Sequence, residues 1–111
     1  MTGPAHVLVV EESTAIGMAL ERRLTGCAVL RHADTAHLPA DRRGWGAYDV
    51  VIVCPYVAAP ARTGIVAAVA RAGRRPTLVL LHDRHEAGVE VASGGDPVAP
   101  EVRAVLAALR E

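Results

Sequence analysis

The sequence is poor in aromatic residues: it has no Phe and a single Trp, and aromatic residues make up 3% of the chain. Single-stranded nucleic acids bind proteins largely by stacking bases on aromatic rings, so the chain offers few surfaces for such binding. Lysine is also absent, and 12 Arg balance 12 acidic residues. A net charge of zero argues against non-specific attraction to DNA or to acidic membranes. The absence of Lys beside abundant Ala, Gly and Arg is typical of a high-GC bacterium.

Cysteine is nearly absent as well, and Cys27 and Cys54 do not form a Cys-x-x-Cys pair. This spacing excludes a disulfide framework and a structural zinc motif. No apolar run approaches the roughly 20 residues of a membrane span. Glu11 and Glu12 interrupt the first apolar run too early for a signal peptide. We therefore expect a cytoplasmic protein.

Aliphatic residues, in contrast, are plentiful. Hydrophobic residues make up 51% of the chain and charged residues 22%, which provides enough apolar surface for a folded core. A length of 111 residues fits one domain and leaves no room for a second. We therefore expect residues 1–111 to form a single domain.

Short apolar runs alternate with helical patterns along the chain. Strands are expected at residues 6–10, 27–31, 49–54, 77–81 and 89–92. Ser13 and Thr14 are suited to cap a helix after the first strand, and Gly26 is suited to end it. The alternation implies right-handed βαβ units and hence an open, doubly wound parallel sheet of the α/β class.

Helical signals are weaker in the middle of the chain. Residues 39–43 permit at most a short helix, because Pro39 fits only a first turn. After the third strand, Pro55 and Pro60 are expected to hold an extended loop before a helix that ends at Gly73. The core face of that helix is expected at Ile65, Val66 and Val69.

The direction of the fifth strand is the weakest point of this topology. Only seven residues separate Leu81 from Val89, whereas a parallel crossover usually takes a dozen or more. Seven extended residues reach about 23 Å, which is just enough for a return without a helix. We expect a parallel fifth strand, with an antiparallel edge strand as the competing arrangement.

In an open α/β sheet, ligands bind beyond the carboxyl ends of the strands. The residues expected at that edge are Glu11, Glu12, Cys54, Leu81 and Ser93. Cys54 stands five residues after Asp49, and Leu81 stands five residues after Pro76. Together with the acidic pair that closes the first strand, this pattern resembles the receiver domain of bacterial response regulators over essentially the whole chain. The resemblance implies a flavodoxin-like sheet of strand order 2-1-3-4-5, with the helix between strands four and five missing or reduced.

The resemblance also implies a role for each edge residue. Glu11 and Glu12 fall on the acidic pair that holds magnesium, and Cys54 falls on the phospho-accepting Asp. Leu81 falls on the position of the Thr or Ser that acts as a switch in receiver domains, and Ser93 falls on the position of their characteristic Lys. Phosphoryl transfer needs a carboxylate nucleophile, a divalent cation and groups that hold the phosphoryl oxygens, and Cys54, Leu81 and Ser93 supply none of these. We therefore expect a degenerate phosphorylation pocket, with no catalytic residue, no cofactor and no metal.

The expected function is that of a phosphorylation-independent pseudo-receiver, a regulatory module that works through protein contact. The resemblance implies a transcription regulator in which such a module forms a homodimer or binds a partner regulator, while DNA is bound only by a separate domain, if one exists. Residues 1–111 are then either the N-terminal domain of a longer regulator or a stand-alone interaction protein. One alternative is a domain that senses a small organic ligand at the sheet edge, which Cys54, Leu81 and Ser93 make more apolar than a charged phosphorylation pocket. A Cys54-dependent enzyme or redox sensor is the third interpretation.

Two further features of the sequence have a functional and a structural interpretation. His82, Asp83 and His85 have a spacing seen in metal sites, but a solvated turn is the favoured interpretation. Glu11 and Glu12 either retain a weak cation site or simply favour the start of a helix.

The last helix is a candidate interaction surface. Its apolar stripe is mostly expected in the core, and an Ala-rich flank beside the stripe permits close packing of a partner helix. The residues assigned to the possible interaction face are Val98, Val102, Val105 and Leu109, and the flanking residues are Ala99, Ala104, Ala107 and Ala108.

Overall fold

A computed structural model of the chain describes residues 3–72, 76–81, 89–93 and 99–110. The strands are β1 (Ala5–Val10), β2 (Ala28–Ala33), β3 (Val50–Val53), β4 (Thr77–Leu81) and β5 (Val89–Ser93). The helices are α1 (Thr14–Leu24), α2 (Arg42–Gly46), α3 (Ala59–Ala70) and α4 (Pro100–Arg110). Among the described residues, no helix is long and apolar enough to cross a membrane.

The strands form one sheet of order β2-β1-β3-β4-β5. β2, β1, β3 and β4 are parallel, as the alternating pattern predicts. β5 is antiparallel to β4, so the prediction of a parallel fifth strand is wrong. The physical reason is the seven-residue connection between the two strands, which is too short for an ordinary parallel crossover.

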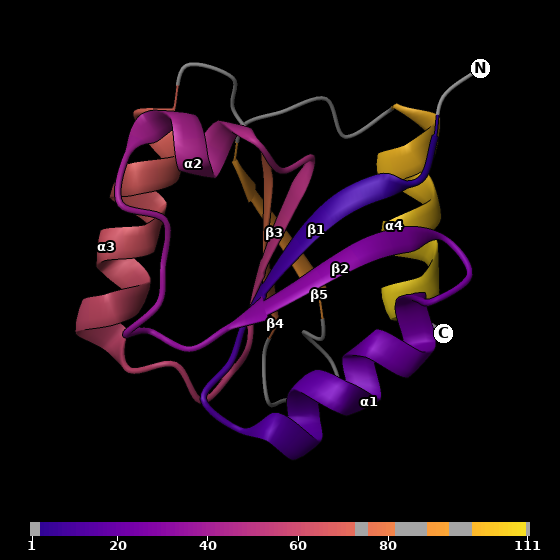
Figure 1. The fold of residues 1–111 in the computed structure, drawn as a ribbon, viewed down its shortest axis with the longest axis horizontal. Coiled ribbons are helices and arrows are strands. Elements are labelled where there is room, and N and C mark those ends of the chain that lie inside the picture. The colour runs from indigo at the N-terminus through magenta and orange to yellow at the C-terminus, as the bar shows by residue number, and fades with distance from the viewer. Residues whose placement is uncertain (1–2, 73–75, 82–88, 94–98, 111) are drawn as a thin grey trace.

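Helices cover both faces of the sheet, as Figure 1 shows. α1 and α4 pack on one face, where Leu24 and Val105 join a cluster with alternate residues of the central strands. α2 and α3 pack on the other face, where Trp45 and Ile65 join the second cluster. Each residue of β3 is buried, because this central strand has helices on both sides.

Local capping explains where the helices begin. Ser13 Oγ accepts a hydrogen bond from the backbone N–H of Ile16 and caps α1 as predicted. Asp41 Oδ1 accepts from the N–H of Gly44 at 2.8 Å. This cap places α2 three residues later than the expected start of the short helix at residue 39.

The third helix starts earlier than the sequence predicts. Pro60 lies in the first turn of α3 instead of in an extended loop. Proline is tolerated there because the first helical N–H groups have no intrahelical partner. Ile65 and Val69 face the core, whereas Val66 is 36% exposed and does not belong to the core face.

The apolar stripe of α4 lies inside the domain. Val102, Val105 and Leu109 are buried in the core cluster, so they contact the domain itself and are not exposed to a partner. Ala104 and Ala107 are exposed, and they mark the outer side of α4. Val98 lies outside the described residues.

We expect Leu24→Ala to lower the free energy of unfolding by about 2–5 kcal/mol, because it removes a fully buried side chain from α1 and leaves a cavity. Met18→Ala on the same helix is the matched control, since Met18 is 48% exposed, and its effect should stay within about 0.5 kcal/mol. Urea denaturation of both variants measures the difference. Equal losses would contradict the packing described for α1.

Candidate functional site

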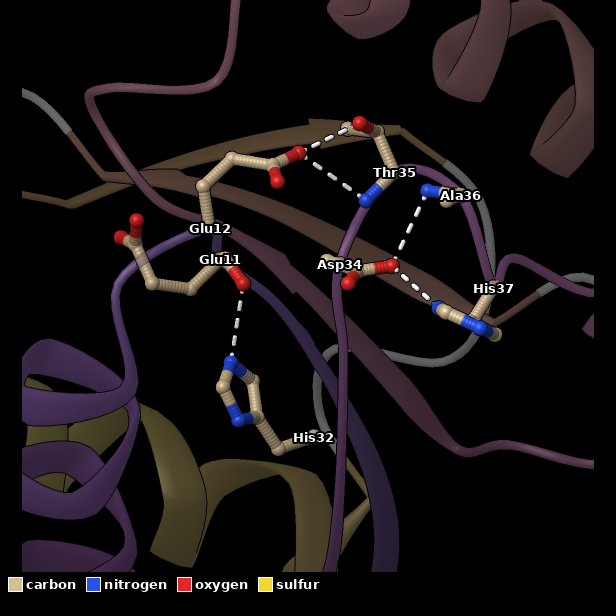
Figure 2. Close-up of polar contacts among 7 residues, drawn as sticks. All are labelled: Glu11, Glu12, His32, Asp34, Thr35, Ala36 and His37. Carbon is tan, nitrogen blue, oxygen red and sulfur yellow. Dashed lines mark hydrogen bonds and ion pairs between the residues drawn. The ribbon is translucent and has the colours of Figure 1, made fainter.

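The two acidic residues that follow β1, Glu11 and Glu12, direct their side chains to different parts of the protein. Figure 2 shows the side chains of Glu11 and Glu12 pointing away from each other. Glu12 Oε1 accepts hydrogen bonds from the backbone N–H of Thr35, at 3.0 Å, and from its hydroxyl. Glu12 therefore ties the end of β1 to the loop that follows β2.

Glu11 is turned into the protein and is 1% exposed. Its Oε1 accepts a hydrogen bond from the backbone N–H of Ser13 at 3.0 Å. Its Oε2 is buried without a hydrogen-bond partner. The two carboxylates therefore do not face a common point in this arrangement (Figure 2). Within the described ranges, no group of three or more His, Cys, Asp or Glu is placed to hold a metal ion.

His32 supports this end of the sheet from β2. Its Nε2 lies 2.9 Å from the backbone oxygen of Glu11, and it donates because a carbonyl oxygen only accepts. The ring packs on Gly17 of α1 so closely that a Cβ at Gly17 would lie 2.7 Å from the ring. A glycine inside a helix is the sequence signal for such a close approach, and it was the available clue to His32.

Cys54 follows β3 and is fully buried on the same face as α1 and α4. Its backbone N–H donates to the carbonyl of Val10 at 3.1 Å, which continues the pairing of β1 and β3. Burial raises the pKa of the Cys54 thiol well above its ordinary value, and the neighbouring Glu11 carboxylate raises it further. The positive charge of Arg62 acts in the opposite direction but is the weaker influence. The thiolate form is therefore strongly disfavoured.

Arg62 of α3 fixes the loop that leaves Cys54. Its Nη2 donates to the backbone oxygens of Cys54 and Pro55, at 3.1 and 2.9 Å. The Nε of Arg62 is buried without a partner. Nothing in the local sequence predicts this contact, because it depends on where α3 begins relative to the end of β3.

A second hydrogen-bonded group lies in the loop after β2 (Figure 2). Asp34 Oδ1 accepts from the N–H of Ala36 at 3.0 Å and lies 2.6 Å from Nδ1 of His37. The hydrogen bond and charge of His37 lower the pKa of Asp34. These side chains order the loop, and the sequence patterns did not single them out.

The antiparallel direction of β5 removes one predicted residue from the site. Ser93 pairs with Leu78, and Val89 pairs with Leu81. Ser93 therefore lies toward the amino end of β4, away from the edge where Cys54 lies, and its assignment to that edge is wrong.

Leu81 is partly buried and packs against the core cluster on the α1 and α4 face. His82, Asp83 and His85 lie outside the described residues.

The structure thus brings together the buried carboxylate of Glu11, the buried thiol of Cys54 and the partly buried guanidinium of Arg62. A thiol held in its neutral form is a poor nucleophile. A buried thiol is also a poor magnesium ligand, because magnesium prefers oxygen. The arrangement is suited to closing the sheet edge and not to covalent chemistry.

Comparison with known proteins adds no family assignment. No protein-family model matches the chain, and neither curated proteins nor solved structures give a match. The fold and the site geometry are therefore the basis of the functional proposal.

We expect iodoacetamide to modify Cys54 of the folded protein far more slowly than Cys27, which is only partly buried. The thiolate is the reactive form, and the raised pKa of Cys54 shifts its formation well above the pH of about 8.5 at which a free thiol titrates. Peptide mass spectrometry after reaction at several pH values measures both rates. In urea both thiols should react alike, and a Cys54 rate equal to that of a free thiol in the folded protein would contradict the site as described.

Proposed function

We propose that this chain is a phosphorylation-independent pseudo-receiver, a regulatory module of a transcription regulator that acts through protein contact. The observation that carries the proposal is the buried pair of Cys54 and Glu11 at the end of the central strands. In a receiver-like arrangement this place needs a carboxylate that water, magnesium and a phosphodonor can reach. Here it holds a protonated thiol without exposed surface.

The residues around Cys54 support the same interpretation. Glu11 is enclosed, and Oε1 of Glu12 accepts hydrogen bonds from Thr35, so the two carboxylates are not held side by side as the magnesium ligands that phosphoryl transfer requires (Figure 2). Leu81 lacks a hydroxyl, and the reversed β5 takes Ser93 away from the edge. Several groups that phosphoryl transfer needs are therefore missing at the same time. This favours the interpretation that the domain acts through its surface contacts and not through phosphorylation.

The outer side of α4 is the surface that suits a partner helix best. Ala104 and Ala107 are exposed there, one helical turn apart. Small side chains allow two helix backbones to approach closely, and the remaining stripe of α4 already anchors the helix in the core. We propose that this side forms the contact of a homodimer, and that DNA is bound by a separate domain.

Incubation of the protein with magnesium and carbamoyl phosphate should leave its intact mass unchanged, because the acceptor position holds Cys54. Intact-mass spectrometry detects a phosphoryl adduct as an increase of about 80 Da. A receiver domain with an acceptor Asp, treated in parallel, shows that the reagent is active. A stable adduct on a side chain of this protein would refute phosphorylation independence.

Sedimentation equilibrium should give the mass of a dimer for the unmodified chain and of a monomer for Ala104→Glu, because a buried like-charge pair opposes close helix packing. Ala70→Glu is the matched control, since Ala70 is exposed on α3, across the sheet from α4. A chain that stays monomeric at all concentrations would refute dimerisation. A dimer that survives Ala104→Glu would place the contact elsewhere.

A further inference from the structure

A pocket of about 250 Å³ opens between α2 and the β1–β2 edge of the sheet, on the face opposite α1 and α4. α2 has only five residues, fewer than half as many as α1 or α3, so it covers this part of the sheet incompletely. Neither Glu11 nor Cys54 lines the pocket. It is therefore separate from the closed edge of the sheet and independent of the proposed function.

The wall of the pocket combines an apolar surface with a cation. Leu8 and Arg31 are paired neighbours on β1 and β2 and line the pocket side by side. Leu8 is 1% exposed, whereas Arg31 lies on the edge strand and is exposed. Leu38, Pro39 and Tyr48 complete the apolar surround. The pocket thus combines an apolar surface with a neighbouring guanidinium.

The charged side chains around the pocket indicate that it favours an anionic ligand. No acidic side chain lines it, and the guanidinium of Arg31 makes no hydrogen bond or ion pair within the part of the chain that the structure describes. His37 also lines the pocket, and its Nδ1 is directed to Asp34, so its Nε2 is left for other contacts. Oδ1 of Asp34 accepts from His37 and from the N–H of Ala36.

We propose that this pocket binds a small organic carboxylate, with its apolar body between Leu8 and Tyr48 and its carboxylate on Arg31. Arginine matches a carboxylate with two parallel N–H···O bonds, and the pairing is strongest next to apolar surface. The volume is below the range of about 300–1,000 Å³ that is usual for drug-sized ligands, so the fitting ligand has a single ring or a short chain. Inorganic anions share the charge but leave the apolar wall uncovered.

Titration of the full ¹⁵N-labelled chain with sodium benzoate, followed by two-dimensional NMR, tests the proposal. Saturable shifts should appear at residues 8, 31, 37, 38, 44, 47 and 48, which line the pocket and carry a backbone N–H. Benzamide has the same shape without the charge and should bind at least about tenfold more weakly, as should inorganic phosphate, which lacks the ring.

Two variants test separately the charge of Arg31 and the volume of the pocket. Arg31→Gln should weaken benzoate binding by about tenfold or more, and Arg103→Gln, a matched change of an exposed Arg on α4, should leave it unchanged. Ala47→Leu places a larger side chain at the exposed rim of the pocket and should abolish binding of both aromatic probes.

Three outcomes would overturn the proposal: no saturable shift with benzoate, equal binding of benzoate and benzamide, or unchanged binding in Arg31→Gln. Binding of phosphate as tight as that of benzoate would also overturn it, because the pocket would then recognise charge alone. Neither exposed Arg is a member of a core cluster, so both substitutions should leave the fold intact, and the amide spectrum of each variant checks this directly.

Discussion

The carboxylate of Glu11 is the point around which one end of this sheet is organised. It is the one charged side chain that is buried among the described residues, and burying a charge is costly unless polar groups surround it. Ser13, which caps α1, donates to its Oε1, and His32 of β2 donates to its backbone oxygen. The thiol of Cys54 lies beside it. Four elements therefore meet at this residue.

This arrangement links the buried side chains of Glu11 and Cys54 to polar groups nearer the surface, at Ser13 and His32. Such a network is sensitive to each of its members, because the loss of one partner leaves another buried group unsatisfied. Oε2 of Glu11 and Nε of Arg62 already lack partners. A substitution at this edge is therefore expected to act on stability first, because the contacts of Cys54 with Val10 and Arg62 hold β1, β3 and α3 together.

Residue patterns predict those parts of the fold that depend on local sequence. The apolar runs of β1 and β3 and the Ser13 cap of α1 are local signals, and all were placed correctly. The position of Cys54 at the end of β3 follows from the same signals. Gly17 signals that some group approaches α1 closely. That this group is His32, and that Arg62 reaches Cys54, was not predictable, because these partners depend on the packing of separate elements, 21 residues apart in the case of His32 and Glu11. Ser93 was misplaced because strand direction is decided by a connection and not by the strand's own residues.

The reversal of β5 also changes the electrostatic character of the carboxyl edge. In a sheet of parallel strands with right-handed crossovers, each helix begins at that edge and directs the positive end of its macrodipole toward it. α1 and α3 follow this rule. Because the chain leaves β5 at the opposite end, α4 runs in the same direction as β3 and β4, as Figure 1 shows. The negative end of its dipole therefore points toward the edge that holds Glu11, and the positive potential that would draw an anion there is weaker than in a fully parallel domain.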